Sequence, residues 1–199
     1  MNAGSRAALS LSFLMGELNR PLRLPLAHIS LEELWSCPDP VLARLLKLRA
    51  TETGRMADFR RRFDAEAARK RLQDGGIGAV TLGDSAYPAC LAAIYDPPPT
   101  LFWRSRWLER MQDFISTPRI AIVGARAATR YGIEVAGMLA DALSGAGICV
   151  VSGLAMGIDA AAHQGALGGS GGSVAVLGCG IDICYPRRHR RLMEALLDN

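Results

Sequence analysis

The sequence lacks any apolar run approaching the ~20 residues that a membrane-spanning helix needs, so we expect no membrane partner. A short apolar stretch follows Arg6, but it has no small-residue cleavage site, and Glu17 and Asn19 follow it at once. A secretory signal peptide is therefore disfavoured, and the stretch is interpreted as a helix of a protein core. The expected location is the cytoplasm.

The five cysteines form no C-x-x-C pair, which is the common signature of zinc sites and dithiol redox sites. We therefore predict no metal site and interpret the cysteines as reduced, buried thiols of a cytoplasmic protein. They are Cys37, Cys90, Cys149, Cys179 and Cys184. A redox-sensitive role stays open for Cys179 and Cys184, because they lie near the predicted binding turns.

Two common nucleotide-binding signatures are also missing. The sequence has no Walker-type G-x-x-x-x-G-K-[ST] segment. Gly124 is followed by Ala125, Arg126 and Ala127, whereas a dinucleotide fingerprint requires G-x-G-x-x-G. A site for ATP or NAD is therefore disfavoured, and we predict no cofactor.

The composition is that of a folded chain. Half of the 199 residues are hydrophobic, which is enough to build one full domain and a smaller one. The net charge of +4 permits a nucleic-acid partner without requiring one. The distribution of the basic residues therefore matters more than their number.

Three short apolar runs organise the second half of the chain, at residues 120–123, 148–151 and 174–177. Each is rich in β-branched residues and ends in a glycine-bearing turn, which is typical of a buried parallel strand. Helical patterns at 132–144 and 158–167 separate the runs. This alternation predicts an α/β fold with a doubly wound parallel sheet. Ligands of such sheets bind beyond the carboxyl ends of the strands.

The turns at these carboxyl ends suit an anion. Glycine lets a ligand approach the backbone, and a following helix N-terminus offers free N–H groups with a partial positive charge. Arg126 adds a planar fork that matches phosphate oxygens. We therefore favour a site for a phosphodiester backbone. The turns contain Gly124, Ala125 and Arg126, then Ser152, Gly153, Met156 and Gly157, then Gly178 and Gly180.

Several multi-residue motifs in this region resemble one family. They are Val123-Gly124-Ala125-Arg126 with Thr129, Ser152-Gly153-Leu154-Ala155-Met156-Gly157-Ile158-Asp159 with Ala162-His163, Leu177-Gly178-Cys179-Gly180-Ile181-Asp182 with Tyr185-Pro186, and, upstream, Tyr87-Pro88 with Asp96-Pro97-Pro98. In this order they resemble the DNA-processing protein A (DprA/Smf) family over about residues 9–192. The resemblance implies a Rossmann-like core preceded by a small helical, sterile-alpha-motif-like (SAM-like) domain.

The resemblance also implies a function. Members of this family bind and protect single-stranded DNA during natural transformation, load the RecA recombinase onto it and act as homodimers, without catalysis. Carried onto this sequence, it places contacts with DNA at the three glycine turns and at Thr129. Arg187 and Arg188 belong to a basic cluster after Tyr185 and Pro186. For this cluster, contact with phosphate and a solvated helix start both remain open.

Asp159 and His163 stand four residues apart on a predicted helix and could form an acid–base pair. The sequence offers no convincing nucleophile, metal or third group beside them. We therefore expect Asp159 to complement the helix N-terminus and to face backbone N–H groups, with His163 packed beside it. Together with Tyr185 and Pro186, they are expected to build the site, and no catalytic residue is predicted.

Two alternatives to DNA binding stay open. One is a phosphoribohydrolase-like enzyme, although its Pro-Gly-Gly-x-Gly-Thr loop is absent and residues 168–172 read as a flexible connector. The other is an inactive fragment, because the Ser-Glu and Phe-Pro…Arg-Asn-Arg motifs of the family do not occur before residue 199. We accordingly expect a sheet that is incomplete at its C-terminal side. Residues 120–123 would then form an open edge that self-associates or binds the missing half.

The first 75 residues have helical periodicity and are predicted to form the SAM-like domain. Residues 76–118 are interpreted as a linker and lead-in with a short strand at 79–82, and residues 119–199 as the partial DNA-binding domain. Ser30 and Glu33 form a capping-box pattern.

Two segments of this first half carry basic residues. A helix predicted over 52–74 is arginine-rich, and its basic face is interpreted as solvated rather than as a DNA-binding surface. Trp103 and Trp107 lie among arginines and could stack on bases. The spacing of Phe102, Trp103, Trp107 and Met111 also suits a helix buried by one face, which we favour.

Overall fold

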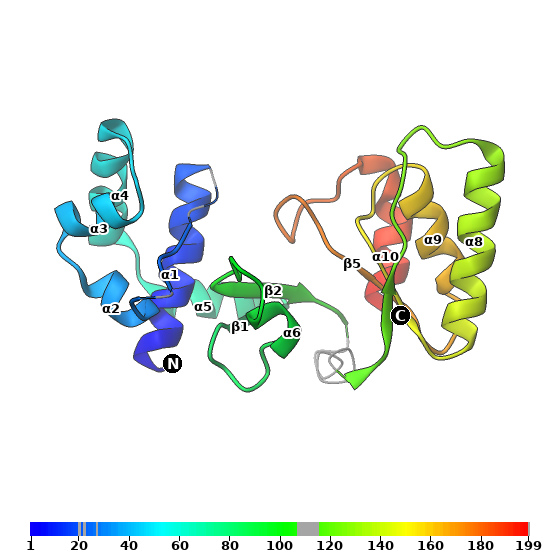
Figure 1. Ribbon diagram of the computed structural model, residues 1–199, viewed down its shortest axis with the longest axis horizontal. Helices are drawn as coiled ribbons and strands as arrows, with labels where there is room; N and C mark the ends of the chain where they lie inside the picture. The colour runs from blue at the N-terminus through cyan, green and yellow to red at the C-terminus, as the bar shows by residue number, and fades with distance from the viewer. Residues whose placement is uncertain (20, 22, 27, 107–115, 199) are drawn as a thin grey trace. The chain divides into compact units, whose positions relative to one another are not determined.

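The structure is a computed structural model that describes residues 1–19, 21, 23–26, 28–106 and 116–198. It divides into two compact units, Met1–Trp103 and Arg104–Asn199 (Figure 1). Trp107 and Met111 of the predicted aromatic helix, and the neighbouring Arg110, lie outside the described residues. No helix in the described ranges is long and apolar enough to cross a membrane.

The first unit is mainly helical. Its main helices are α1 (Ala3–Leu18), α2 (Leu31–Ser36), α3 (Asp39–Leu45), α4 (Ala50–Arg62) and α5 (Ala65–Asp74). The helices α1 to α4 each contribute apolar residues to one core, because apolar residues recur at helical spacing. The fully buried side chains of this core include Leu11, Leu14, Leu34, Leu42 and Met56. At the start of α2, Ser30 Oγ accepts from Glu33 N at 3.2 Å and Glu33 Oε2 accepts from Ser30 N at 2.9 Å, which confirms the predicted capping box.

The single helix predicted over residues 52–74 is wrong, because the chain breaks it into α4 and α5 at Phe63 and Asp64. Asp64 Oδ1 accepts from Glu66 N at 2.9 Å and from Ala67 N at 3.1 Å, so Asp64 caps a new helix. The extended backbone at Phe63 lets its ring pack on Phe59 and Phe13, with centroids 4.6 and 5.1 Å away. The N-cap at Asp64 and the burial of the Phe63 ring thus stabilise the fold more than one unbroken helix would.

The basic face of α4 is laced with ion pairs. Arg62 lies 2.8 Å from Glu17, Arg61 pairs with Asp58, and Arg60 pairs with Asp39. The Arg60 guanidinium also lies 5.1 Å from the centroid of the Trp35 ring. Arg61 and Arg62 are exposed, as the solvated-face interpretation predicts, whereas Arg60 is largely buried and joins α4 to α2 and α3.

Residues 77–103 belong to the first unit. β1 (Ile77–Thr81) pairs with β2 (Thr100–Arg104) in a two-stranded sheet, with the short helix α6 (Ala89–Ala92) between them. β1 confirms the predicted short strand. Phe102 and Trp103 lie in β2, so the favoured helical interpretation of these two residues is wrong. A Cβ on Gly78 would lie 2.1 Å from the Trp103 ring, so this glycine makes room for it.

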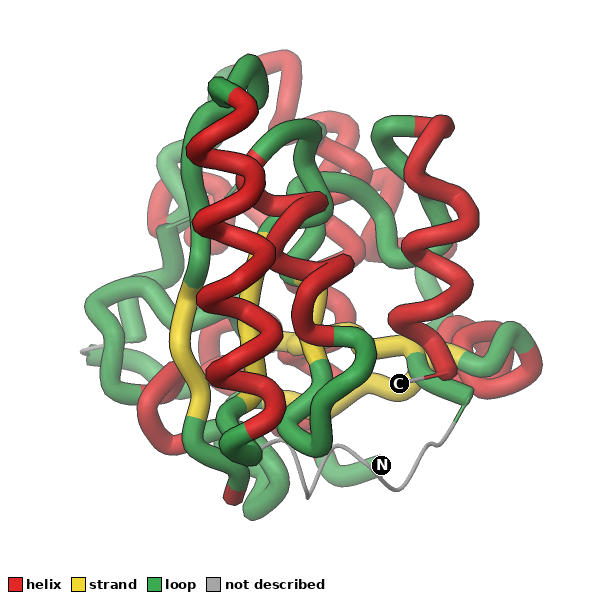
Figure 2. Tube along the Cα trace, turned by 90° about the vertical axis from the view of Figure 1, so that its right-hand side faces the viewer, coloured by secondary structure: helices red, strands yellow, loops and turns green. Residues whose placement is uncertain are grey.

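The second unit contains a parallel sheet with the strand order β3-β4-β5. The strands are β3 (Arg119–Ala121), β4 (Cys149–Ser152) and β5 (Ser173–Ala175). α8 (Arg130–Gly145) joins β3 to β4, and α9 (Ile158–Ala166) joins β4 to β5. The two helices lie side by side on one face of the sheet (Figure 2). The predicted α/β fold and strand order are confirmed, with strand bounds shifted by one or two residues.

The open edge predicted for the first strand is also confirmed. All three residues of β3 are exposed, and within the described residues no strand pairs with β3 on the side away from β4. After β5 the chain forms η1 (Arg187–His189) and α10 (Arg190–Asp198).

Glycines allow α8 and α9 to approach closely. A Cβ on Gly165 would lie 2.2 Å from the carbonyl oxygen of Gly137 on the facing helix. Ala140, Ala162 and Ala166 are buried beside these glycines. Packing between the helices therefore requires glycine at position 165.

We expect Gly165→Ala to destabilise the second unit by about 1–3 kcal/mol, because the added methyl group forces two helix backbones apart. Gly145→Ala is the matched control, since a Cβ at position 145 in the last turn of α8 meets nothing within 4 Å. The control should be neutral or stabilising by up to ~1 kcal/mol, because alanine is the better helix former. Urea unfolding measures the stability of both variants. Equal changes in the free energy of unfolding would contradict the role of Gly165 in helix packing.

Candidate nucleic-acid interface

The three predicted turns begin side by side at the carboxyl ends of the strands. Ala121 is level with Val151, and Ser152 is level with Ala175. Pairing continues for one more residue, with Val176 N donating to Ser152 O at 2.8 Å. The parallel register therefore gathers the segments after residues 121, 152 and 175 at one edge of the sheet.

Asp159 joins two of these turns. This carboxylate lies in the first turn of α9 and is only 6% exposed. Its Oδ1 accepts from Gly124 N at 3.3 Å, and its Oδ2 accepts from Gly153 N at 3.1 Å. The expectation that Asp159 faces backbone N–H groups is thus confirmed. The same bonds occupy the Gly124 and Gly153 amides, so these two groups are not free donors for a phosphate.

The glycines of the first two turns serve packing within the protein. A Cβ on Gly124 would lie 2.7 Å from the Ile158 side chain, and one on Gly153 would lie 2.8 Å from Asp159 Oδ2. Gly157 has a φ of +79°, and a Cβ there would lie 2.2 Å from Ala125 O. These three glycines are therefore required by packing within the protein, and the expectation that they also admit a ligand stays a prediction. Of the five glycines predicted in the three turns, Gly178 alone is exposed with nothing within 4 Å of a Cβ.

His163 is buried in a closed hydrogen-bond network. Its Nε2 lies 3.2 Å from Leu154 N, which can only donate, so Nε2 accepts and Nδ1 carries the proton. Nδ1 donates to Ser173 Oγ at 2.7 Å, and that hydroxyl donates to Val150 O at 2.8 Å. Burial lowers the pKa of His163 to about 4, although the nearby Asp159 charge opposes this shift. The ring is a neutral structural group, which argues against the acid–base alternative.

The network extends to the basic cluster. Leu154 has a φ of +57°, and its carbonyl oxygen lies 2.9 Å from His189 Nδ1. The peptide groups of Leu154 are therefore held by His163 on one side and His189 on the other. A leucine in the left-handed region has no signature in the sequence, so this role of Leu154 is visible only in the structure.

Exposed arginines border the turn between Ser152 and Gly157 on two sides. Arg188 contacts the Met156 sulfur, and the backbone of Arg126 lies against Gly157. Arg126 and Arg187 have no carboxylate partner in the part of the chain that the structure describes. Because Asp159 is committed to backbone amides, the charge that this turn shows to solvent is positive.

Other predicted site residues form hydrogen bonds within the protein. Thr129 caps α8, with its Oγ1 accepting from Gly132 N at 3.1 Å. Ser152 is buried, and its Oγ donates to Ile122 O at 2.7 Å, so its side chain is not available to a ligand. Ala125 is exposed, but its carbonyl oxygen accepts from Ile158 N at 3.3 Å.

The third turn and the segment after it are more open. A Cβ on Gly180 would lie 2.8 Å from Asp182 Oδ1, so the second glycine of the third turn accommodates a neighbouring side chain. Pro186 precedes η1 as its N-cap, and Tyr185 is 64% exposed. None of the described residues forms a cluster of three His, Cys, Asp or Glu side chains able to hold a metal ion.

Comparison with known proteins points to one group. Residues 78–199 match the DNA recombination-mediator protein A family. The chain is 38% identical over 111 residues to DNA processing protein DprA of Streptococcus pneumoniae. That alignment covers 56% of this chain and 37% of the relative, so the chain matches only part of the relative's length.

Solved structures agree. The X-ray structure of DNA processing protein A from Streptococcus pneumoniae aligns with all of this chain at a TM-score of 0.70 and 25% identity, and 65% of that chain is covered. DNA processing protein A from Helicobacter pylori, solved to explain its single-stranded DNA binding mode, aligns at a TM-score of 0.52 and 25% identity. This alignment covers 62% of this chain and 52% of that chain.

We expect Asp159→Asn to lower the unfolding free energy by about 1–3 kcal/mol, because an amide N–H₂ would face a backbone N–H that the carboxylate now satisfies. Asp141→Asn, an exposed aspartate on α8, is the control and should change stability by less than about 0.5 kcal/mol. Denaturant unfolding of both variants tests this. If Asp159→Asn left the free energy of unfolding unchanged, the negative charge would not be needed to satisfy the two backbone amides.

The stability of the second unit should fall on acidification through His163. Its pKa is about 4 in the folded protein and about 6.5 when unfolded, so between these values the unfolded state binds the extra proton. Unfolding free energy should therefore drop by about 3 kcal/mol as the pH falls from above 6.5 to below 4. His163→Gln keeps a donor and an acceptor but cannot titrate. Urea unfolding should show a weaker pH dependence in this variant, and His28→Gln, at an exposed site, should behave like the parent.

Proposed function

Because the chain belongs to the DNA recombination-mediator protein A (DprA/Smf) family, we propose that its second unit binds the phosphodiester backbone of single-stranded DNA. The binding surface is the turn between Ser152 and Gly157 with the arginines on either side of it. One observation carries this proposal. Arg126 and Arg187 are exposed without a carboxylate partner in the described chain, while the carboxylate of Asp159 is held by backbone amides.

Arginine side chains, rather than backbone amides, are the phosphate ligands in this proposal. Two of the amides first expected to bind phosphate are taken by Asp159. A guanidinium presents several N–H donors in a planar fork and stays charged at every physiological pH. The backbone of Arg126 lies beside Gly157, and the Arg188 guanidinium contacts Met156 in the same turn, so a single strand that lies across the turn passes between these two residues.

An exposed aromatic ring supports a single strand over a free phosphate. Tyr185 is 64% exposed and directly precedes Pro186 and the arginines of η1. Unpaired bases stack on such rings, which adds affinity without base specificity. The single-stranded DNA binding of the Helicobacter pylori relative, which has a similar fold, is in line with this choice.

We further propose that the protein acts without catalysis, hands single-stranded DNA to a RecA recombinase and does so as a cytoplasmic homodimer. The description of the family as a recombination mediator supports the recombinase as partner. The closed network of His163 supports a non-enzymatic role, because neither ring nitrogen is free to move a proton to a substrate. The phosphoribohydrolase alternative would need such a group.

Arg126→Ala should weaken binding to oligonucleotides of every sequence alike. The slope of log affinity against log salt should shrink by ~0.7, the value for one phosphate contact on a single strand. Arg126→Lys should restore the slope but only part of the affinity, since an ammonium group lacks the bidentate fork. Fluorescence anisotropy with a labelled oligonucleotide over a salt series measures all three proteins.

Arg130→Ala is the matched control. Arg130 is equally exposed, but its Nε donates to Glu134 at 2.8 Å on α8. Its loss should leave the salt slope unchanged. An unchanged slope for Arg126→Ala would contradict the phosphate role. Release of free base from AMP that Asp159→Asn abolishes would favour the enzyme instead.

A further inference from the structure

His189 joins two segments of the proposed DNA-binding surface that are distant in the sequence. Its Nδ1 lies 2.9 Å from the carbonyl oxygen of Leu154, which is 35 positions earlier, in the turn between Ser152 and Gly157. A carbonyl oxygen can only accept, so Nδ1 carries a proton and donates. His189 is the last residue of η1, whose two arginines are exposed. This hydrogen bond therefore ties the turn to the segment that carries the arginines.

Leu154 adopts a backbone conformation that needs such support. Its φ of +57° lies in the left-handed region, which is unfavourable for residues other than glycine. Its side chain is fully buried. Its N–H donates to Nε2 of the neutral His163 ring at 3.2 Å, while its carbonyl oxygen accepts from His189. The two histidines therefore hold both backbone polar groups of this residue.

The residues that follow Leu154 in the turn have less support. The backbone N–H groups of Ala155 and Met156 donate to no other group in the part of the chain that the structure describes. Arg188 contacts the sulfur of Met156 in this same part of the turn. The hydrogen bonds of Leu154 therefore fix the backbone next to the place where an arginine meets the turn.

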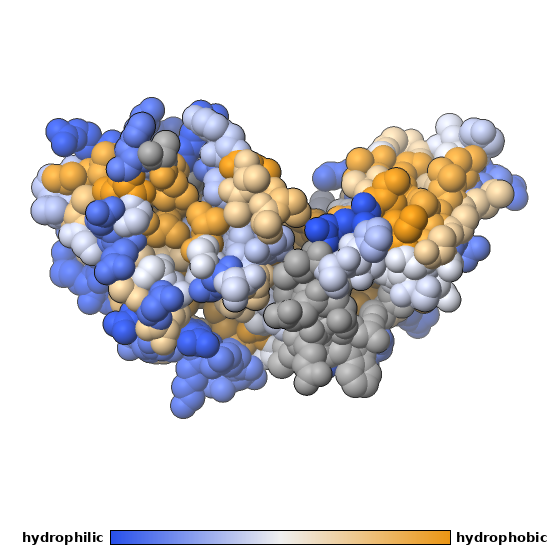
Figure 3. Space-filling model, turned by 60° about the horizontal axis from the view of Figure 1, so that its bottom comes forward, coloured by the Kyte–Doolittle hydropathy of each residue, from blue (hydrophilic) through white to orange (hydrophobic). Residues whose placement is uncertain are grey.

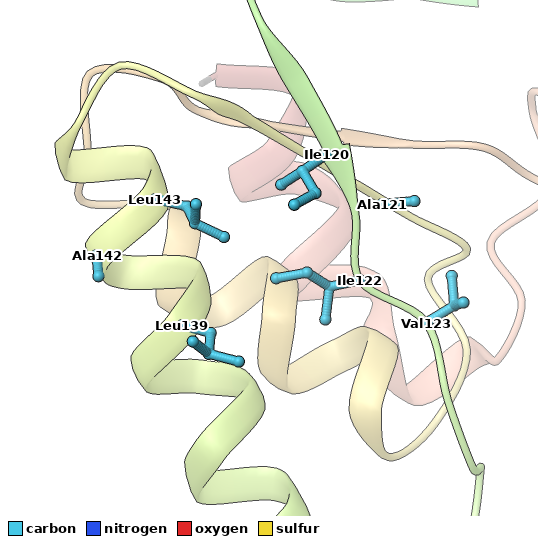
Figure 4. A pocket seen from close by; sticks show the side chains of 7 residues that line it. All are labelled: Ile120, Ala121, Ile122, Val123, Leu139, Ala142 and Leu143. Carbon is cyan, nitrogen blue, oxygen red and sulfur yellow. The ribbon is translucent and has the colours of Figure 1, made fainter.

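Another surface of the second unit has a different character. Apolar side chains gather at the surface of this unit, at the right of Figure 3. A groove beside β3 is lined by apolar side chains, and Ile120 and Ile122 there point toward Leu139 and Leu143 of α8 (Figure 4). A phosphodiester backbone finds no charged partner in this groove. The turn that contains Leu154, with the exposed arginines beside it, is therefore the surface where a positioning residue affects DNA.

We propose that His189 is a positioning residue for the binding of single-stranded DNA. Its Nδ1–H holds the turn and the arginines of η1 in the arrangement that fits a phosphodiester backbone, and the ring itself contacts no phosphate. This inference rests on the proposed function of the surface. Without the hydrogen bond to Leu154, the turn and η1 adopt other arrangements as well, and the fraction of protein molecules ready to bind DNA falls. The apparent affinity falls by the same factor.

Three substitutions of His189 separate the hydrogen bond from the rest of the ring. In His189→Asn, the amide Nδ2 takes nearly the place of the histidine Nδ1, because both atoms are bonded to Cγ, so a donor is kept. In His189→Gln, one more methylene group carries the amide past the carbonyl oxygen of Leu154. His189→Ala removes the donor altogether. The asparagine and glutamine side chains are both neutral, so the comparison between them involves no difference in charge.

Fluorescence anisotropy with a labelled single-stranded oligonucleotide measures the effect on binding. We expect His189→Gln and His189→Ala to weaken binding about five- to tenfold, as the loss of one hydrogen bond predicts. His189→Asn should stay within about twofold of the parent. The slope of log affinity against log salt should be the same in all of them, because no phosphate contact is lost. His28→Gln, at an exposed site in the first unit, should bind like the parent.

Hydrogen exchange of the protein without DNA tests the same hydrogen bond independently. The Leu154 N–H should exchange faster in His189→Gln and His189→Ala than in His189→Asn or the parent, because the turn opens more often. The Val150 N–H, which donates to Gly172 O at 3.1 Å from within β4, is the internal control and should exchange equally in all four proteins.

The possible results distinguish this role from the DNA-binding function itself. A parent protein that binds no oligonucleotide would overturn the DNA-binding function and this role with it. If the parent binds, the role of His189 alone is overturned by equal affinity in all variants, by His189→Asn binding as weakly as His189→Ala, or by unchanged exchange at Leu154. A salt slope that shrinks by ~0.7 in His189→Ala would also overturn it, because His189 would then be a phosphate ligand.

Discussion

One buried carboxylate ties together the ligand-facing end of the second unit. Asp159 accepts from the amides after β3 and after β4, so the two turns and the first turn of α9 hold one arrangement. A charge that is 6% exposed is tolerable only if its oxygens stay hydrogen-bonded. That condition in turn requires glycine at position 153, where a Cβ would lie 2.8 Å from the carboxylate.

This constraint decides which charges meet a ligand. Inside the protein, backbone amides donate to the carboxylate of Asp159. The neutral ring of His163 accepts a hydrogen bond from the backbone N–H of Leu154. The groups left at the surface are guanidinium groups, which need no backbone strain to reach a phosphate. The buried carboxylate of Asp159 thus has its hydrogen-bond partners inside the protein, while the exposed surface of the same turn is basic.

The sheet presents two surfaces of different character. Its carboxyl ends are polar and basic, whereas the edge of β3 is lined by apolar side chains, and no other strand of the described residues pairs with β3 on the side away from β4. Both follow from the order β3-β4-β5, because that order gathers the turns at one end and leaves β3 outermost.

The sequence alone determined the strand order, the two crossover helices, the capping box at Ser30 and the contact of Asp159 with backbone amides. These rest on local patterns, namely β-branched runs, helical spacing and the place of a carboxylate in a first helical turn. The DprA/Smf resemblance rested on short motifs in a fixed order, which sequence also carries directly.

Only the tertiary structure decided the rest. The break at Phe63 depends on aromatic rings brought together from α1 and α4. Residues 77–103 join the first unit through contacts of β1 with α1 and α5. The roles of Gly124, Gly153 and Gly157 depend on which atoms a Cβ would meet, and those atoms belong to residues distant in sequence. A pattern of residue types shows which secondary structures and contacts each residue can form. Contacts between segments distant in sequence decide which of these the folded protein contains.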